Sequence, residues 1–234
     1  MAEDYERVAA SFDCAFLSPN KEYAATSSDE TIHLFGGAFN YVHGFQLGEV
    51  TFLETGISFG ALTGNSEEVT LAKETTLREK FVNMNLQVPL NIVYRLPLSE
   101  KVSMSVFAGI VGKCNLSYKV QTTARGLQVP GGHLSHTMNL LSGTSKGMDE
   151  NKVWNRWQAA WQIGVGVNIR QYYIGVSGGT DIVPVYSRAN SNINSAGLKV
   201  TLGYTFHVNW KKLFSRQKSS SYPESMAAPK SLTR

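Results

Sequence analysis

The chain has 234 residues, of which 42% are hydrophobic and 17% are charged, so it fits one large folded domain or two small ones and is not a disordered chain. No stretch approaches 18 consecutive apolar residues and the mean hydropathy is −0.16, which excludes a transmembrane helix. A membrane β-barrel stays open, because its signal is an alternation of apolar and polar residues that window averages hide.

The net charge of +4 is unevenly distributed along the chain. Residues 211–234 carry six basic residues and one acid, which give +5 and leave the rest of the chain close to neutral. A nucleic-acid-binding domain would instead place its Lys and Arg on a folded face, so no nucleic-acid partner is expected. We interpret this segment as a solvated, disordered tail, with contact to anionic lipid headgroups or cell-wall polymer as the alternative.

The two cysteines, Cys14 and Cys114, are far apart and match no zinc-ligand or CxxC spacing. We therefore expect no metal site, no cofactor and no disulfide. The N-terminus shows no basic region followed by an apolar stretch, so no signal peptide is visible. A membrane barrel then requires that its export signal was removed or lies outside this chain.

Alternation of apolar and polar residues predicts the secondary structure in chain order. The clearest segment spans residues 154–169, where period two holds for about 16 residues, roughly 50 Å of strand and more than a bilayer core needs. Segment 32–42 is apolar on both parities, so its facing stays open. The predicted strands lie at residues 8–17, 32–42, 51–61, 82–94, 102–119, 154–169, 172–181 and 197–206.

The two faces of these strands differ sharply in composition. From residue 82 onward the apolar face carries no charge, while the opposite face is rich in Gly, Ser, Asn and Gln and includes Lys119. Water-facing strands of soluble proteins are richer in Lys and Glu, so the polar face is predicted to line a narrow lumen. Because an unpaired charge is costly there, we expect a network of paired charges that plugs the lumen. Its predicted members are Asp13, Glu54, Lys113, Arg156, Arg170, Asp181 and Lys199.

The links between strands alternate between long and short. Long polar links near 18–31, 62–77, 120–153 and 185–195 alternate with short ones, as in outer-membrane barrels with short periplasmic turns. This predicts an all-β, eight-stranded antiparallel up-and-down transmembrane β-barrel in the cell outer membrane, with both termini periplasmic. Aromatic residues near strand ends are expected at the membrane interfaces. They are Tyr94, Trp157, Trp161, Tyr172, Tyr204 and Phe206.

Four segments resemble the PorT-like outer-membrane β-barrel family, a porin-family group of Bacteroidota. They are MNLQVPLNIVYRLPL (84–98), VFAGIVGKCNLSYK (106–119), WQIGVGVNIRQYYIGVSGGTDIV (161–183) and GLKVTLGYTF (197–206). The resemblance covers roughly residues 45–206 and implies an integral outer-membrane barrel. Such barrels commonly end at the terminal aromatic strand, whereas here 28 residues follow Phe206.

We therefore expect residues 1–7 to be a periplasmic segment, 8–210 the barrel and 211–234 a basic periplasmic tail. The favoured function is non-enzymatic: a structural, adhesion or secretion-accessory role. Expected partners are outer-membrane lipids and lipopolysaccharide, the barrel-assembly machinery and an extracellular or secretion-system partner.

Two alternatives remain. His133 and Ser135, beside His136 in the longest link, suggest a lipid-modifying outer-membrane hydrolase, although a mobile loop would hold no fixed oxyanion geometry. A soluble lipocalin-like ligand-binding barrel would turn the apolar face inward.

Within segment 82–94, Pro89 lacks an amide donor and predicts a bulge.

Overall fold

The computed structural model describes residues 4–19, 31–66, 68–71, 75–126, 132–141, 154–188 and 191–207. These residues form eleven antiparallel strands. The strands are β1 Tyr5–Pro19, β2 Ile32–Gln46, β3 Thr51–Asn65, β4 Val69–Leu71, β5 Thr75–Ser99, β6 Val102–Arg125, β7 His133–Asn139, β8 Trp157–Ile169, β9 Tyr172–Asp181, β10 Tyr186–Arg188 and β11 Ser191–Phe206. None of the described residues belongs to a helix long and apolar enough to cross a membrane.

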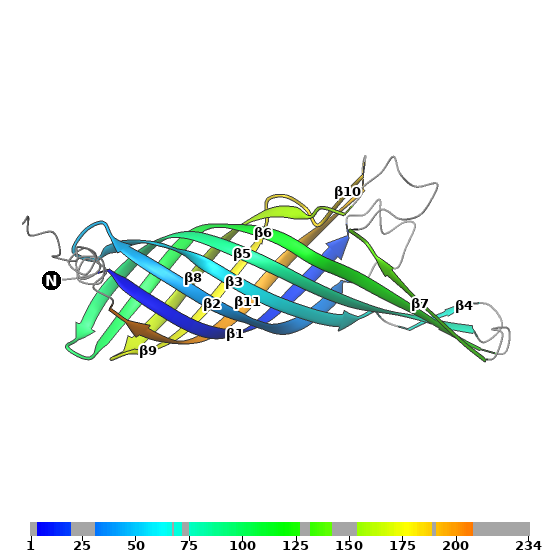
Figure 1. Cartoon of the computed structure of the whole chain (residues 1–234), viewed down its shortest axis with the longest axis horizontal. Coiled ribbons are helices and arrows are strands. Elements are labelled where there is room, and N and C mark those ends of the chain that lie inside the picture. Colours follow the sequence, from blue (N-terminus) through cyan, green and yellow to red (C-terminus); the bar gives the residue numbers. More distant parts are fainter. Residues whose placement is uncertain are drawn as a thin grey trace, which may run out of the picture.

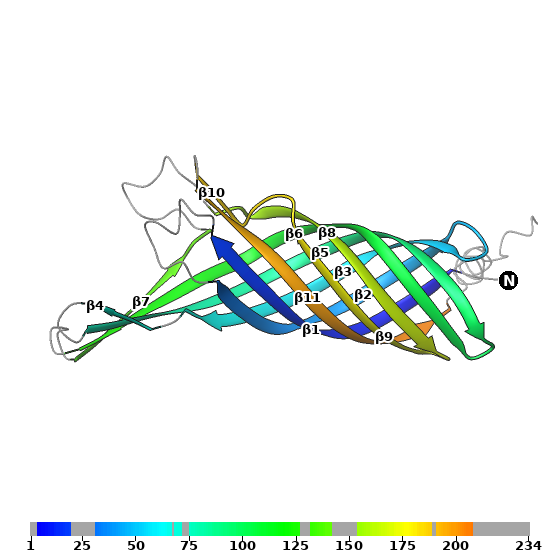
Figure 2. The same cartoon turned by 180° about the vertical axis from the view of Figure 1, so that it is seen from behind.

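Eight of these strands close into a ring, in the order β1, β2, β3, β5, β6, β8, β9, β11 (Figures 1 and 2). The ring closes where β1 pairs with β11, from Glu6 opposite Phe206 to Pro19 opposite Ile193. Neighbours in the ring are neighbours in sequence apart from the short strands between them, which is the up-and-down topology. The eight-stranded antiparallel barrel expected from the alternation is confirmed.

The two ends of the barrel differ, and we name them by their connections. At the short-turn end, β5 and β6 are joined at residues 100–101 and β8 and β9 at residues 170–171, and β1 begins beside them (Figure 1). At the long-loop end, β5 and β6 run on past the other strands of the ring (Figure 1). β5 has 25 residues, about 80 Å of strand, against 13 residues in β8.

The overhanging parts of β5 and β6 form a projecting sheet together with two short strands. β4 pairs with β5 from Val69 opposite Leu77, and β7 pairs with β6 from Lys119 opposite Asn139 to Arg125 opposite His133. We call this four-stranded sheet, in the order β4, β5, β6, β7, the extension. The links expected near 62–77 and 120–153 thus contain strands, because hairpin pairing continues beyond the ring.

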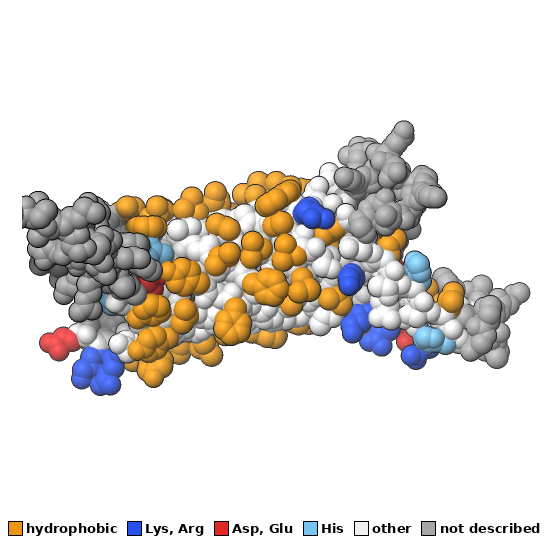
Figure 3. Space-filling view, in the orientation of Figure 1, with side chains coloured by type: hydrophobic (Ala, Val, Ile, Leu, Met, Phe, Trp, Pro, Cys, Tyr) orange, Lys and Arg blue, Asp and Glu red, His pale blue; other side chains and the backbone are white. Residues whose placement is uncertain are grey.

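The apolar face of each ring strand points away from the barrel axis. Large apolar residues on this wall are well exposed, such as Phe39 at 78% and Trp157 at 72%. The space-filling view shows apolar side chains spread over the middle of the barrel on the face in view (Figure 3). On β2, the strand whose facing was open, Phe35, Phe39 and Tyr41 are exposed, while Leu34, Ala38 and Val42 are buried. The alternation therefore gave the correct facing for the other ring strands, with one exception on β6.

That exception is a β-bulge on β6. Met84 pairs with Ser117 but Asn85 pairs with Asn115, so Leu116 is an extra residue in β6. Beyond it the two faces exchange parity: Tyr118 is buried, and Lys119, expected on the lumen face, is exposed on the outside. A single inserted residue explains the exchange, because side chains alternate with period two.

The bulge predicted at Pro89 is not found. Pro89 pairs in register with Val111 of β6, and the shifts in the β5–β6 ladder lie elsewhere. On its other side, β5 pairs with β3. The register is the same at Ser58–Gln87 and at Thr55–Leu90, but the residues between these two pairs are not paired. Pro89 therefore interrupts this ladder without inserting a residue, and its carbonyl oxygen accepts a hydrogen bond from Thr55 Oγ1 at 2.9 Å.

Glycine permits a close approach of neighbouring strands at Gly56 on β3. A methyl group built there would lie 2.0 Å from the carbonyl oxygen of Tyr41 and 2.8 Å from Val42 Cα, both backbone atoms of β2. At the exposed Gly112 of β6, the nearest atom to an added methyl group is Val88 O at 3.9 Å. The two sites provide a matched pair within one barrel wall.

We expect Gly56→Ala to lower the free energy of unfolding by about 1–3 kcal/mol, because β2 must shift to relieve the overlap. Gly112→Ala should leave it nearly unchanged. Equilibrium unfolding in urea with the barrel in lipid vesicles, followed by tryptophan fluorescence, measures both changes. Equal stability of the two variants would show that the close approach to β2 is not required.

Candidate functional site

The inner face of the barrel near the short-turn end contains a buried ion pair. Arg7 Nη2 lies 2.7 Å from Glu54 Oε2, and the two side chains are 6% and 5% exposed. Tyr5 donates its hydroxyl proton to the same carboxylate oxygen at 2.7 Å. β1 places Tyr5 and Arg7 on its inner face because they share the parity of Ser11 and Asp13.

Aromatic rings and a second arginine complete this layer. The Arg7 guanidinium lies 3.8 Å from the centre of the Tyr173 ring, and the Arg95 guanidinium lies 4.2 Å from the Tyr5 ring and 4.9 Å from the Phe52 ring. Cation–π contacts of this kind are stronger where water is excluded. We call Tyr5, Arg7, Phe52, Glu54, Arg95 and Tyr173 the arginine layer.

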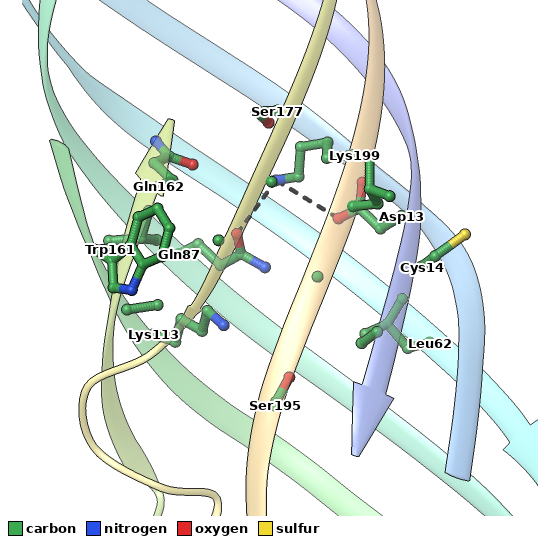
Figure 4. Close-up of a pocket in the computed structure, with 17 residues that line it drawn as sticks. Asp13, Cys14, Leu62, Gln87, Lys113, Trp161, Gln162, Ser177, Ser195 and Lys199 are labelled. Atoms are coloured by element: carbon green, nitrogen blue, oxygen red, sulfur yellow. Dashed lines mark hydrogen bonds and ion pairs between the residues drawn. The ribbon is translucent and has the colours of Figure 1, made fainter. Parts of the chain in front are cut away.

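Two further ion pairs lie toward the middle of the barrel. Lys199 Nζ is 3.5 Å from Asp13 Oδ2 and donates to Gln87 Oε1 at 3.3 Å, as the dashed lines in Figure 4 show. Lys113 Nζ lies 2.9 Å from Asp181 Oδ1, and Asp181 Oδ2 accepts from the Ser195 amide at 3.1 Å. Each lysine thus has a carboxylate partner inside the barrel.

Side-chain amides connect the charged groups across the lumen. Gln87 donates to Asn85, Asn85 to Asn83, and Asn83 to Asn115, at 2.7–2.9 Å. A separate bond joins Gln162 Nε2 to Asn91 Oδ1 at 2.7 Å. Among the described residues, the two cavities around these groups have volumes of about 90 and 60 Å³, room for a few water molecules each.

The lumen changes character at the long-loop end, where its side chains are apolar. The described buried cluster there has side chains 2–6% exposed, and the Leu116 bulge turns two of its members inward. Trp154 and Tyr186 pack against it. We call this cluster the apolar layer; it consists of Leu17, Leu34, Phe81, Tyr118, Val120, Val185 and Ile193.

Five of the seven residues predicted for the charge network lie on the inner face in these pairs: Asp13, Glu54, Lys113, Asp181 and Lys199. Arg156 and Arg170 do not, and this part of the prediction is corrected. Both are exposed, since Arg156 precedes the first residue of β8 and Arg170 occupies the turn after β8 with φ of 57°. Both were assigned to the lumen by parity alone, although Arg156 lies just before β8 and Arg170 just after it.

The sequence interpretation missed Tyr5, Arg7 and Arg95. β1 begins at Tyr5 rather than at the predicted residue 8, and β5 continues to Ser99 rather than ending at 94. The signal was present, because Arg7 keeps the parity of Ser11 and Arg95 that of Asn91. Extending each strand by its own parity would have found both arginines.

The buried Arg7–Glu54 pair predicts a large effect for its disruption. Glu54→Gln removes the carboxylate and leaves the Arg7 charge buried, so we expect a loss of about 3–5 kcal/mol in the free energy of unfolding. Unfolding in denaturant, with the barrel in vesicles, measures the loss.

The double variant Arg7→Met/Glu54→Leu, which removes both charges, should recover most of that stability. If Glu54→Gln were as stable as the parent chain, or the double variant no better than the single one, the pair would not set the stability of this layer.

The outer wall has a polar cluster at the short-turn end. Glu6 Oε1 lies 2.7 Å from His43 Nδ1, and the Tyr41 hydroxyl donates to Glu6 Oε2. Glu6 is only 2% exposed although it shares the parity of the lipid-facing residues. These contacts give an outward carboxylate its polar partners.

The predicted interface aromatics all lie on the outer wall. Tyr172, Tyr204 and Phe206 lie near the short-turn end, where the Tyr172 and Tyr204 rings meet edge to face at 5.8 Å and Tyr204 stacks on Phe206 at 6.4 Å. Tyr94 also lies near the short-turn end, on β5, where it pairs with Thr51 at the start of β3. Trp157 is the first residue of β8 at the long-loop end, and Trp161 lies four residues further into the wall.

The residues suggested for catalysis lie on β7 in the extension, not in a loop. His133 and Ser135 share one face of β7, and His136 is on the other. Ser135 Oγ accepts from Gln121 Nε2 at 3.0 Å. The described residues contain no group of three or more His, Cys, Asp or Glu side chains that could hold a metal ion.

An apolar outer wall, a polar and charged interior, and a closed ring of eight strands define an integral membrane β-barrel protein. In soluble barrels the apolar face is turned inward, so the lipocalin-like alternative does not fit this wall. A family model described as "Outer membrane protein beta-barrel domain" matches residues 7–182. The chain belongs to this family.

Solved structures that resemble this barrel come from Gram-negative bacteria. Ail, the attachment invasion locus protein of Yersinia pestis in complex with the heparin analogue sucrose octasulfate, is 12% identical with a TM-score of 0.47, covering 88% of this chain and 100% of Ail. Neisserial surface protein A is 9% identical with a TM-score of 0.33, covering 85% of this chain and 97% of that protein.

The N-terminal β-barrel domain of Pseudomonas aeruginosa OprF is 13% identical, with a TM-score of 0.26 and coverage of 84% and 97%. No curated protein matches the chain. The assignment to the outer membrane therefore rests on the family match.

Proposed function

We propose that this protein is a non-enzymatic outer-membrane barrel that anchors the extension at the cell surface and conducts no solute. The observation that carries the proposal is the length of β5 and β6, whose pairing continues from the ring through Thr76 opposite Arg125. A barrel that only spans the membrane does not need this overhang. The extension offers an exposed sheet edge, β7, to a partner outside the cell.

The edge of the extension supports a docking role. Six of the seven β7 residues are exposed, and within the described part of the chain β7 pairs with β6 alone. An exposed strand edge can accept an extended segment of a partner through backbone hydrogen bonds. Adhesion, envelope integrity and accessory service to a secretion machine are the processes that such a surface would serve.

The filling of the lumen supports a closed barrel. The arginine layer, the paired lysines and the apolar layer succeed one another along the axis, and an eight-stranded barrel is just wide enough for side chains to fill. No observation favours the hydrolase alternative, since the partner of Ser135 Oγ among the described residues is Gln121 rather than a histidine.

We expect the purified barrel to give no stable conductance steps in planar lipid bilayers, because the described side chains of these layers occupy the lumen. A large porin inserted in the same membrane provides the positive control. Reproducible steps from the folded barrel, identified by its heat-modifiable gel mobility, would contradict a closed lumen.

The proposed orientation places the long-loop end outside the cell and both termini in the periplasm. In a Cys14→Ala/Cys114→Ala background, Ser135→Cys in the extension should react with a membrane-impermeant maleimide on intact cells. Lys101→Cys, in the short turn between β5 and β6, should react only after the outer membrane is permeabilised. The reverse pattern would show the opposite orientation.

A further inference from the structure

Four basic residues share the outward face of the extension. Arg78 and Lys80 lie on β5, and Lys119 and Arg125 lie on β6; all four are exposed. The β5–β6 register places Lys80 opposite Gln121 and Arg78 opposite Thr123, so the four side chains emerge from the same side of the sheet. We call these four residues the basic face.

The basic face continues directly from the lipid-facing wall. On β5 the outward positions Met84 and Val82 are followed by Lys80 and then Arg78. On β6 the bulge at Leu116 brings Lys119 outward, opposite Val82. Figure 3 shows basic side chains beyond the apolar band, on the side of the extension. The charges thus begin where the apolar wall ends.

The charge of this face is not neutralised from within. Among the described residues, the four ion pairs join Arg7, His43, Lys113 and Lys199 to carboxylates, and none uses a residue of the basic face. The neighbouring Glu79 has the opposite parity on β5, and its carboxylate accepts a hydrogen bond from Thr122 at 3.4 Å.

A surface hollow of about 460 Å³ lies on the same side of the sheet. Glu68 is the one acidic residue of its lining, against three residues of the basic face, and hydroxyl and amide groups supply further donors. Its lining consists of Thr63, Asn65, Glu68, Thr76, Arg78, Lys80, Gln121, Thr123 and Arg125.

We propose that the basic face binds the phosphate groups of a phosphorylated glycolipid of the outer leaflet, whose acyl chains lie on the apolar wall below it. Arginine and lysine are suited to phosphate, and consecutive outward positions on a strand are about 7 Å apart, so one headgroup meets several cations. A lipid is favoured over a soluble polyanion because only a lipid also contacts the adjoining wall at Val82 and Met84.

In the cell this inference rests on the proposed outward orientation of the long-loop end, but the binding chemistry does not. The test uses the full-length folded barrel in a zwitterionic detergent, with bis-phosphorylated lipid A as the probe. Native mass spectrometry and a titration of tryptophan fluorescence report the bound lipid. Failure here would leave the closed lumen and the orientation, which conductance and labelling measure, unaffected.

The variant Arg78→Gln/Lys119→Gln removes two charges from the basic face. Because each basic residue at an anionic lipid surface contributes about five-fold in affinity, we expect the dissociation constant for lipid A to rise by about 25-fold. The matched control, Lys101→Gln/Arg170→Gln, removes one lysine and one arginine that are exposed at the short-turn end. It should change the constant by less than two-fold.

Two companion probes identify the ligand chemistry. Dephosphorylated lipid A should bind far more weakly than the bis-phosphorylated form, and inositol hexakisphosphate, which has phosphates but no acyl chains, should compete poorly. Equal losses in the two double variants, or equal binding of both lipid A forms, would overturn the proposal. Binding of inositol hexakisphosphate as tightly as lipid A would overturn the assignment to a lipid. Retained heat-modifiable mobility shows that each variant is folded.

Discussion

The whole structure depends on one requirement: no backbone amide or carbonyl group may face lipid without a hydrogen-bond partner. In the hydrocarbon core an unsatisfied group costs several kcal/mol, so a sheet that crosses it must have no open edge. The ladder between β1 and β11 meets this requirement, because it joins the first and last strands of the ring over almost the full length of β1. Once the ring is closed, most outward side chains need only be apolar, and the described ion pairs lie inside the barrel apart from the one between Glu6 and His43.

Closure also explains why the interior is so heavily bonded. Eight strands leave little room for bulk water, so charges inside must find partners among themselves. Glu54 is shared by Arg7 and Tyr5, and Asp181 by Lys113 and the Ser195 amide. The two carboxylates therefore act as junctions between strands that are distant in sequence.

The alternation in the sequence was sufficient to predict the number of strands in the ring, the facing of all but β2 and the upper part of β6, and five of the charged residues on the inner face. It succeeded because successive side chains of a membrane-barrel strand alternate between lipid and lumen, and these two environments select apolar and polar residues. It failed where the period does not hold or where a strand ends. Arg156 and Arg170 were placed inside because the pattern does not mark the ends of β8, and Arg7 was missed because β1 starts earlier. The extension was assigned to loops, because its sequence lacks the regular alternation of apolar and polar residues that lipid imposes on the ring strands.

The bulge at Leu116 changes which residues of β6 face inward. Below it, odd-numbered residues such as Lys113 and Asn115 point inward; above it, even-numbered residues such as Tyr118 and Val120 do. Deletion of Leu116 would turn the side chains of the residues beyond it to the opposite face of the sheet. Tyr118 and Val120 would then face outward, while the charge of Lys119 would be directed into the apolar layer. One unpaired residue thus keeps the mouth of the barrel dry on the inside and cationic on the outside, and related chains would have to preserve the count of residues along β6 even where they change the residues themselves.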